Sequence, residues 1–294
     1  MIPIEDFFKN YQTNYFRYQQ IINKDALDNI DHWVDKFQDD SNSNDKSKVT
    51  QIIKSHIRFN YLHSIDTLFE LVFGLFPRDG KINDFDLPLI LAKSNDSFNN
   101  PKLMKLANDD EEIIRDLGQE ISYGDKKTNL LRYIFFYQID EVNTLNSDFH
   151  ENIDQSQKHI LKLLKIFARD LNDKSEYNSL KHALRVFPFS GSLTFFHPKT
   201  NKAIAGVKMV DAHQFITEHK GEIKITSRNF DSERDFKYTM ISSNLIWNII
   251  KIREKFIAHK SETASCYVYF FDDDEYMEIE KSNFHKQKIE IKIK

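Results

Sequence analysis

A segment in the C-terminal third brings together residue types that can do acid–base chemistry on a phosphodiester. Residues 253 to 259 read REKFIAH, and Lys260 follows directly. Imidazole titrates near neutral pH, so His259 can act as a general acid or base. The planar guanidinium of Arg253 can hold phosphate oxygens through several donors. Such a pair can cleave a phosphodiester by acid–base chemistry without a metal, with Lys260 as a further phosphate contact.

The residues before this motif predict a helix that would hold it rigidly. Leu245, Ile246, Ile249 and Ile250 recur at three- and four-residue steps, which is typical of a helix that buries a broad face. The polar segment 242–244 offers N-cap oxygens ahead of that run, and neither Gly nor Pro interrupts the helix.

The same charges also admit a purely structural interpretation. Cations in the last turn of a helix interact favourably with its macrodipole, by about 0.3–1 kcal/mol each, so Arg253, Lys255 and His259 can serve as a helix-end cap. On an ideal helix Arg253 and His259 lie about 120° apart. They face one cleft only where the helix ends or bends near His259.

The REKFIAH motif resembles the R-x(4–6)-H signature of the HEPN superfamily, which is found in helical nucleases and toxins of prokaryotic defence and toxin–antitoxin systems. The resemblance covers this helix and, more loosely, the helices between residues 49 and 187. It implies an RNA substrate, His259 as the catalytic acid or base and Arg253 as the phosphate-binding cation. It also implies a homodimer in which two motifs meet, and a protein antitoxin as a further partner.

Two other clusters carry cations and histidines at helical spacing. Arg58 and His63 lie inside a long apolar segment, where they either satisfy buried partners or form a second wall of the RNA site. Lys181 and His182, with Arg185 nearby, form the polar face of another helix. That face can bind phosphate, or it can simply be solvated.

The pattern along the chain predicts an α+β protein that is mainly α, a helical bundle with a β insertion and C-terminal strands. The expected domains are a helical hairpin over residues 1–38, a polar linker over 39–48 and a bundle over 49–294. Long helices are expected at 49–76, 153–172 and 242–260, and shorter ones at 4–22, 26–37, 87–93, 101–107, 109–121, 126–139 and 175–187.

Strands are expected where the period of the apolar residues changes from helical to alternating. The β insertion, at about 190–241, contains predicted strands at 192–197, 203–210, 222–226 and 236–241. Further strands are expected at 266–271, 276–280 and 287–293, within the C-terminal segment of about 266–293.

Composition excludes several classes of function. The net charge of -4 provides no global attraction for nucleic acid or an anionic membrane. The single cysteine excludes an internal disulfide, and the start of the chain lacks the layout of a signal peptide, so a cytoplasmic protein without a membrane span is expected.

Phosphate-binding glycine loops and compact metal-ligand spacings are absent. His197, Asp211 and His213 lack metal-site spacing, and the acidic run 272–275 suits a hairpin turn. Neither a metal nor a cofactor is expected.

Two hypotheses of different class follow. The first is a metal-independent HEPN-type endoribonuclease with an antiphage or toxin role. The alternative is a non-catalytic helical interaction module or a nucleotide-binding module, in which the same residues serve as caps and buried pairs and the β elements dock a partner.

Overall fold

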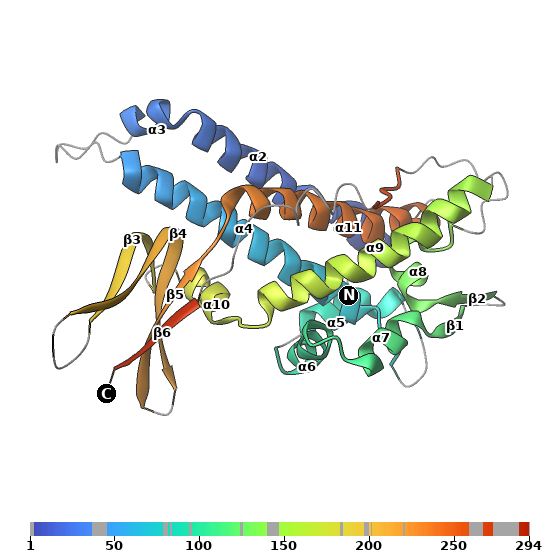
Figure 1. Cartoon of the computed structure of the whole chain (residues 1–294). Helices are drawn as coiled ribbons and strands as arrows, with labels where there is room; N and C mark the ends of the chain where they lie inside the picture. Colours follow the sequence, from blue (N-terminus) through green and yellow to red (C-terminus); the bar gives the residue numbers. More distant parts are fainter. Residues whose placement is uncertain are drawn as a thin grey trace. The chain divides into compact units, whose positions relative to one another are not determined.

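The computed structural model confirms the α+β, mainly α class (Figure 1). It describes residues 3–36, 46–78, 84–93, 96–123, 126–139, 147–182, 185–196, 202–219, 221–258, 267–272 and 288–293, together with Ile82 and Thr200. The chain divides into two compact units. Unit 1 comprises Met1–Arg17, Leu62–Asp173 and Thr239–Lys281, and unit 2 comprises Tyr18–Tyr61, Lys174–Tyr238 and Ser282–Lys294.

Unit 1 is mostly helical. Its elements are α1 (Ile4–Asn10), the later part of α4 (Lys46–Gly74), the 3₁₀-helix η1 (Asp84–Asp86), α5 (Leu87–Lys93), α6 (Asp96–Ala107), α7 (Glu111–Gly118), β1 (Glu120–Tyr123), β2 (Lys126–Asn129), α8 (Leu130–Phe135), α9 (Ser147–Leu171) and the later part of α11 (Ser232–Ala258). Helix α9 packs against α6 and α8, and β1 pairs with β2 in an antiparallel hairpin.

The core of unit 1 is built from the apolar faces of its long helices. Leu68 and Leu71 of α4, Leu164 and Phe167 of α9 and Ile249 of α11 have no exposed surface. Burial of each such side chain contributes about 1.5–3 kcal/mol. The apolar residues that predict α4, and the amphipathic pattern that predicts α9, therefore reflect the packing of these helices.

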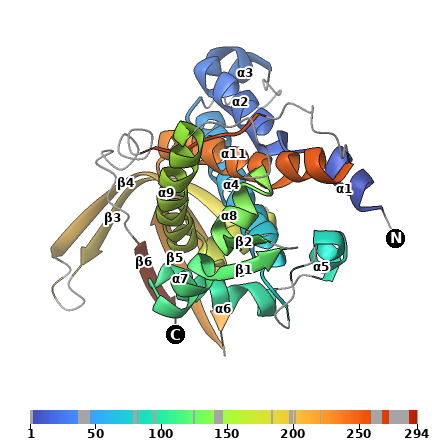
Figure 2. The same ribbon diagram turned by 90° about the vertical axis from the view of Figure 1, so that its right-hand side faces the viewer.

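Unit 2 combines helices with one antiparallel sheet. Its elements are α2 (Tyr15–Asp28), α3 (Ile30–Lys36), the first part of α4, α10 (Ser175–Lys181), β3 (Val186–Phe196), β4 (Ala203–His219), β5 (Glu222–Asn229), the start of α11 and β6 (Lys288–Ile293). The strand order is β3-β4-β5-β6, and α10 packs against β3 and β4. Figures 1 and 2 both show β3 and β4 as a long hairpin.

The last predicted strand is confirmed in detail. β6 pairs with β5 so that Ile291 lies opposite Ile225 and Ile293 opposite Ile223. The predicted strands at 192–197, 203–210 and 222–226 are likewise parts of β3, β4 and β5, although all three real strands are longer. The predicted strand at 276–280, residues 39–45 of the predicted linker and Cys266 lie outside the described residues.

The predicted strand at 236–241 is wrong, because these residues are helical. Helix α11 begins at Ser232, ten residues before the predicted start. Its N-terminus is capped by Asp231, whose Oδ1 accepts hydrogen bonds from the backbone N–H groups of Glu233 and Arg234. The expected cap residue Ser242 is instead buried inside the helix, where its hydroxyl donates to the carbonyl of Thr239.

Several shorter predictions need correction. Residues 126–129 form a strand, so the helix expected at 126–139 is reduced to α8. The helix expected at 175–187 ends at Lys181, since residue 186 already begins β3. The helix expected at 4–22 is broken between α1 and α2, and residues 267–271 do not form the expected strand.

None of the helices that the structure describes combines the length and apolar character that crossing a membrane requires.

Candidate functional site

Arg253, the first residue of the REKFIAH motif, is fully buried in unit 1. Its Nε donates to Asp84 Oδ1 at 2.9 Å. Its Nη1 donates to the carbonyls of Ile134 and Ile249 at 2.7 and 3.1 Å, and its Nη2 donates to the carbonyl of Tyr133 at 2.8 Å. The donors that would hold a phosphate are therefore engaged by acceptors within the protein.

Aromatic rings complete the surroundings of this guanidinium. The Cζ of Arg253 lies 5.1 Å from the ring centre of Tyr133 and 4.6 Å from that of Tyr137, within the range of cation–π attraction. The Tyr133 hydroxyl donates to Asp84 Oδ2 at 2.6 Å. Burial alone would lower the pKa of Arg253, but the charge and hydrogen bond of Asp84, together with the interactions with Tyr133 and Tyr137, outweigh burial and raise the pKa. The guanidinium thus stays charged in the core.

The other two residues of the predicted motif site, His259 and Lys260, lie outside the described residues. The described part of α11 ends at Ala258. Their roles as acid or base and as phosphate contact stay predictions.

Arg58, from the second predicted cluster, is buried in unit 2. Its Nε and Nη2 donate to the two carboxylate oxygens of Glu176 at 3.1 and 3.0 Å, a bidentate pair. Its Nη1 donates to Asp235 Oδ1 at 3.1 Å. Both acids are fully buried. This arrangement matches the interpretation in which Arg58 satisfies buried partners.

His63 belongs to unit 1, whereas Arg58 belongs to unit 2. The His63 ring lies edge-on to Phe16, with ring centres 5.1 Å apart. The third cluster is exposed at the end of α10 in unit 2: Lys181 and His182 both face solvent, and the Lys181 Nζ lies 4.2 Å from the ring centre of Tyr177.

A chain of hydrogen bonds that the sequence did not suggest runs through unit 2. His213 Nδ1 lies 2.9 Å from Glu176 Oε1, and His213 Nε2 lies 2.9 Å from Ser55 Oγ. Serine, histidine and carboxylate follow one another here in the order of a hydrolytic triad. The His213 ring also packs on Phe230, with ring centres 4.5 Å apart.

The direction of the Ser55 hydroxyl argues against a nucleophile. Its Oγ lies 2.8 Å from the carbonyl of Gln51, which can only accept, so Ser55 donates there. The Ser55 oxygen is then left to accept from His213 Nε2. Ser55, His213 and Glu176 are all buried. The three residues are therefore best explained as a buried network whose polar groups satisfy one another.

Glu176 is the centre of this network. Burial alone would raise the pKa of its carboxyl, but the charge of Arg58 and the hydrogen bond and charge of His213 outweigh burial and hold that pKa well below its usual range. Arg228 Nη1 also donates to Glu176 Oε2 at 3.2 Å. The carboxylate therefore joins elements α4, α10, β4 and β5 within unit 2.

Among the residues that the structure describes, no group of three His, Cys, Asp or Glu side chains is placed to hold a metal ion. Asp211 pairs with Lys54 through contacts of 2.8 and 3.0 Å, and His213 bonds to Glu176 and Ser55. His197 lies outside the described residues, as does most of the acidic run 272–275.

The sequence matches no protein-family model, and comparisons with curated proteins and with solved structures find no significant match. The likeness to the HEPN superfamily thus rests on the REKFIAH motif.

Proposed function

We propose that the chain is a non-catalytic interaction module of the cytoplasm, and that one face of the sheet in unit 2 docks a second copy of the chain. The observation that carries this proposal is an exposed apolar patch. Phe187 of β3, Ile216 of β4 and Ile223 of β5 are 52%, 47% and 43% exposed. We call these residues, with the partly exposed Ile225 and Ile289, the isoleucine face.

Strand pairing places these side chains on the same side of the sheet. Ile216 lies opposite Ile225, and Glu218 opposite Ile223. Neighbouring positions along a strand alternate between faces, and accordingly Phe215 and Thr226, the next pair along, are buried. One face therefore packs inside unit 2, while Phe187, Ile216 and Ile223 on the isoleucine face are turned to solvent.

The isoleucine face has the composition of an interface. Among the described residues that β3, β4 and β5 contribute to this face between Phe187 and the β4–β5 turn, Glu218 is the charged one. It lies next to that turn, at the edge of the face. The neighbouring amide of Gln214 is satisfied by donating to Ser227 Oγ at 3.0 Å. Depletion of charge at the centre with polar groups at the rim is typical of protein–protein contacts.

The size of this face suits a modest dimer. Four strands spaced about 4.8 Å apart, each contributing about six residues at about 3.4 Å, cover on the order of 400 Å² in projection. That is about half of the 800 Å² per partner that a specific interface of standard size buries, so the area suits a weak, transient contact. A twofold axis would bring two such faces together about 10 Å apart, as in a β-sandwich.

The buried arginines support the non-catalytic part of the proposal. Arg253 and Arg58 each bind internal carboxylates and have at most 3% of their surface exposed. Guanidinium groups that are held by internal carboxylates fit a structural role better than a role in binding phosphate.

Sedimentation equilibrium tests the dimer. We expect the wild-type protein to associate with a dissociation constant of about 10–100 µM, and Ile216→Lys to weaken association at least about tenfold. The matched control is Ile52→Lys, which places the same charge on a 53% exposed isoleucine of α4 and should leave association unchanged. A wild-type monomer at about 1 mM, or equal effects of both variants, would refute the proposed docking surface.

A further inference from the structure

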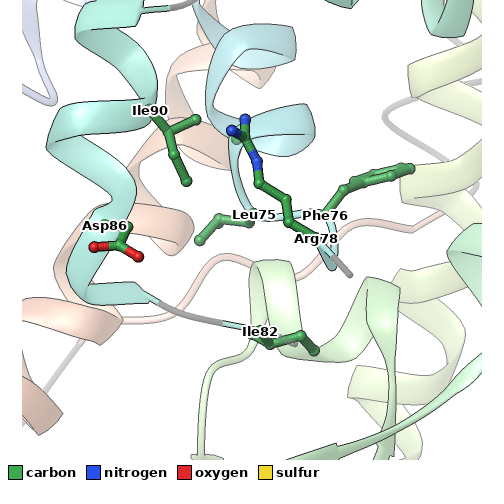
Figure 3. A pocket seen from close by; sticks show the side chains of 7 residues that line it. Leu75, Phe76, Arg78, Ile82, Asp86 and Ile90 are labelled. Atoms are coloured by element: carbon green, nitrogen blue, oxygen red, sulfur yellow. The ribbon is translucent and has the colours of Figure 1, made fainter. Parts of the chain in front are cut away.

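A pocket of about 320 Å³ lies in unit 1 where α4 ends and α5 begins. Its lining combines apolar residues with two opposite charges (Figure 3): Gly74, Leu75, Phe76, Arg78, Ile82, Asp86 and Ile90. A volume near the lower end of the range for ligand sites, about 300–1,000 Å³, fits a molecule the size of an amino acid.

The walls of this pocket are held by close packing. A Cβ at position 74 would lie 2.9 Å from Leu87 Cδ1 and 3.6 Å from Ile90 Cγ2, so the glycine lets α5 approach the end of α4. Leu75 and Leu87 are 3% and 0% exposed. The apolar floor is therefore part of the core of unit 1.

The charged side chains of Arg78 and Asp86 lie on different sides of the apolar lining residues. In Figure 3, Leu75 and Ile90 lie between the Asp86 carboxylate and the Arg78 side chain. Asp86 belongs to η1, and Arg78 follows the end of α4. One region of the pocket is thus suited to a cation and another to an anion, with an apolar surface between them.

A second cation strengthens the positive region. Burial, followed by the charges of Arg78 and Lys105, lowers the pKa of Lys102 on α6. The positive charge of Arg78 therefore repels that of Lys102, a residue of α6 outside the pocket lining. A bound carboxylate would relieve their repulsion.

We propose that this pocket binds a small aminoalkanoic acid, a molecule with a carboxylate, an apolar body and an ammonium group. Arg78 holds the carboxylate, Asp86 holds the ammonium group, and the apolar body lies on Leu75, Ile82 and Ile90. The proposal is independent of the isoleucine face and of the predicted ribonuclease site.

Three matched probes test this assignment: 6-aminohexanoate, hexanoate and hexylammonium. Binding is followed in full-length protein by the methyl NMR signals of Ile82 and Ile90 and by calorimetry. We expect 6-aminohexanoate to bind at least about tenfold more tightly than either singly charged probe, because each correct charge pair adds a charge-assisted hydrogen bond.

Two variants separate the ends of the pocket. Arg78→Gln should remove the advantage of 6-aminohexanoate over hexylammonium, and Asp86→Asn should remove its advantage over hexanoate. The control Lys158→Gln, at an exposed position of α9, should change neither. If no probe binds saturably, or hexanoate binds as tightly as 6-aminohexanoate to the wild type, the proposal is overturned.

Discussion

Asp84 Oδ1 lies 2.9 Å from Arg253 Nε, although the two residues are 169 positions apart, and both side chains are at most 3% exposed. Breaking a buried ion pair leaves one charge without compensation. We expect Asp84→Asn to lower the free energy of unfolding by about 3–5 kcal/mol, measured by urea denaturation.

An exposed aspartate in the same unit provides the control for this change. Asp148 lies in the first turn of α9 and is exposed. Asp148→Asn should change the stability by no more than about 0.5 kcal/mol. Equal effects at both positions would show that the Asp84–Arg253 pair does not stabilise unit 1.

RNA cleavage distinguishes the interaction module from the nuclease. Since the donors of Arg253 are engaged inside unit 1, we expect purified protein to leave a mixed RNA pool intact in EDTA. His259→Ala is the informative variant, because it removes the predicted acid or base and leaves Arg253 in the sequence. Cyclic phosphate ends produced by the wild type and lost in folded His259→Ala would restore the ribonuclease hypothesis.

The long elements were predictable because their patterns are strong. Helices α4 and α9 carry apolar residues at helical steps over many turns, and β6 alternates isoleucine with charge. The start of α11 was missed because residues 236–241 mimic the alternation of a strand over a window too short to reveal a helical period. The stronger signal was Asp231 followed by acidic residues in the first turn, which predicts a helix N-terminus.

The partners of the arginines could not be predicted. Glu176 lies 118 positions from Arg58, and Asp235 lies 177 positions away. Nothing local marks these acids, because Asp235 looks like an ordinary first-turn acid and Glu176 like part of a solvated helix face. Only the tertiary fold brings them together, so the sequence indicated that Arg58 required buried partners without identifying them.

Acid should destabilise unit 2 through Glu176. Its carboxyl pKa is lower in the folded protein than the ordinary value of 4.5, so the unfolded chain binds a proton first as the pH falls. The stabilisation is complete above about pH 5 and is lost as the pH falls towards the lower folded pKa. We expect Glu176→Gln to reduce the slope of unfolding free energy against pH between about 5 and 3.

The control for acid sensitivity is Glu151→Gln, at an exposed position of α9. Both variants remove one carboxylate, but only Glu176 bonds to Arg58 and His213. Urea unfolding at several pH values should therefore give Glu151→Gln the wild-type slope. A Glu176→Gln slope equal to that of wild type would mean that the carboxyl is not ionised in the native network.

Two glycines allow backbone strain to be tested without steric conflict. A Cβ at Gly221 or at Gly118 would meet nothing within 4 Å, but Gly221 has φ of +80° in the β4–β5 turn, whereas Gly118 ends helix α7. The left-handed conformation costs other residues about 1–2 kcal/mol. We therefore expect Gly221→Ala to destabilise by about 1 kcal/mol and Gly118→Ala to be neutral or stabilising by up to about 1 kcal/mol, measured by urea denaturation. If Gly221→Ala proves as stable as Gly118→Ala, the turn does not require a left-handed residue.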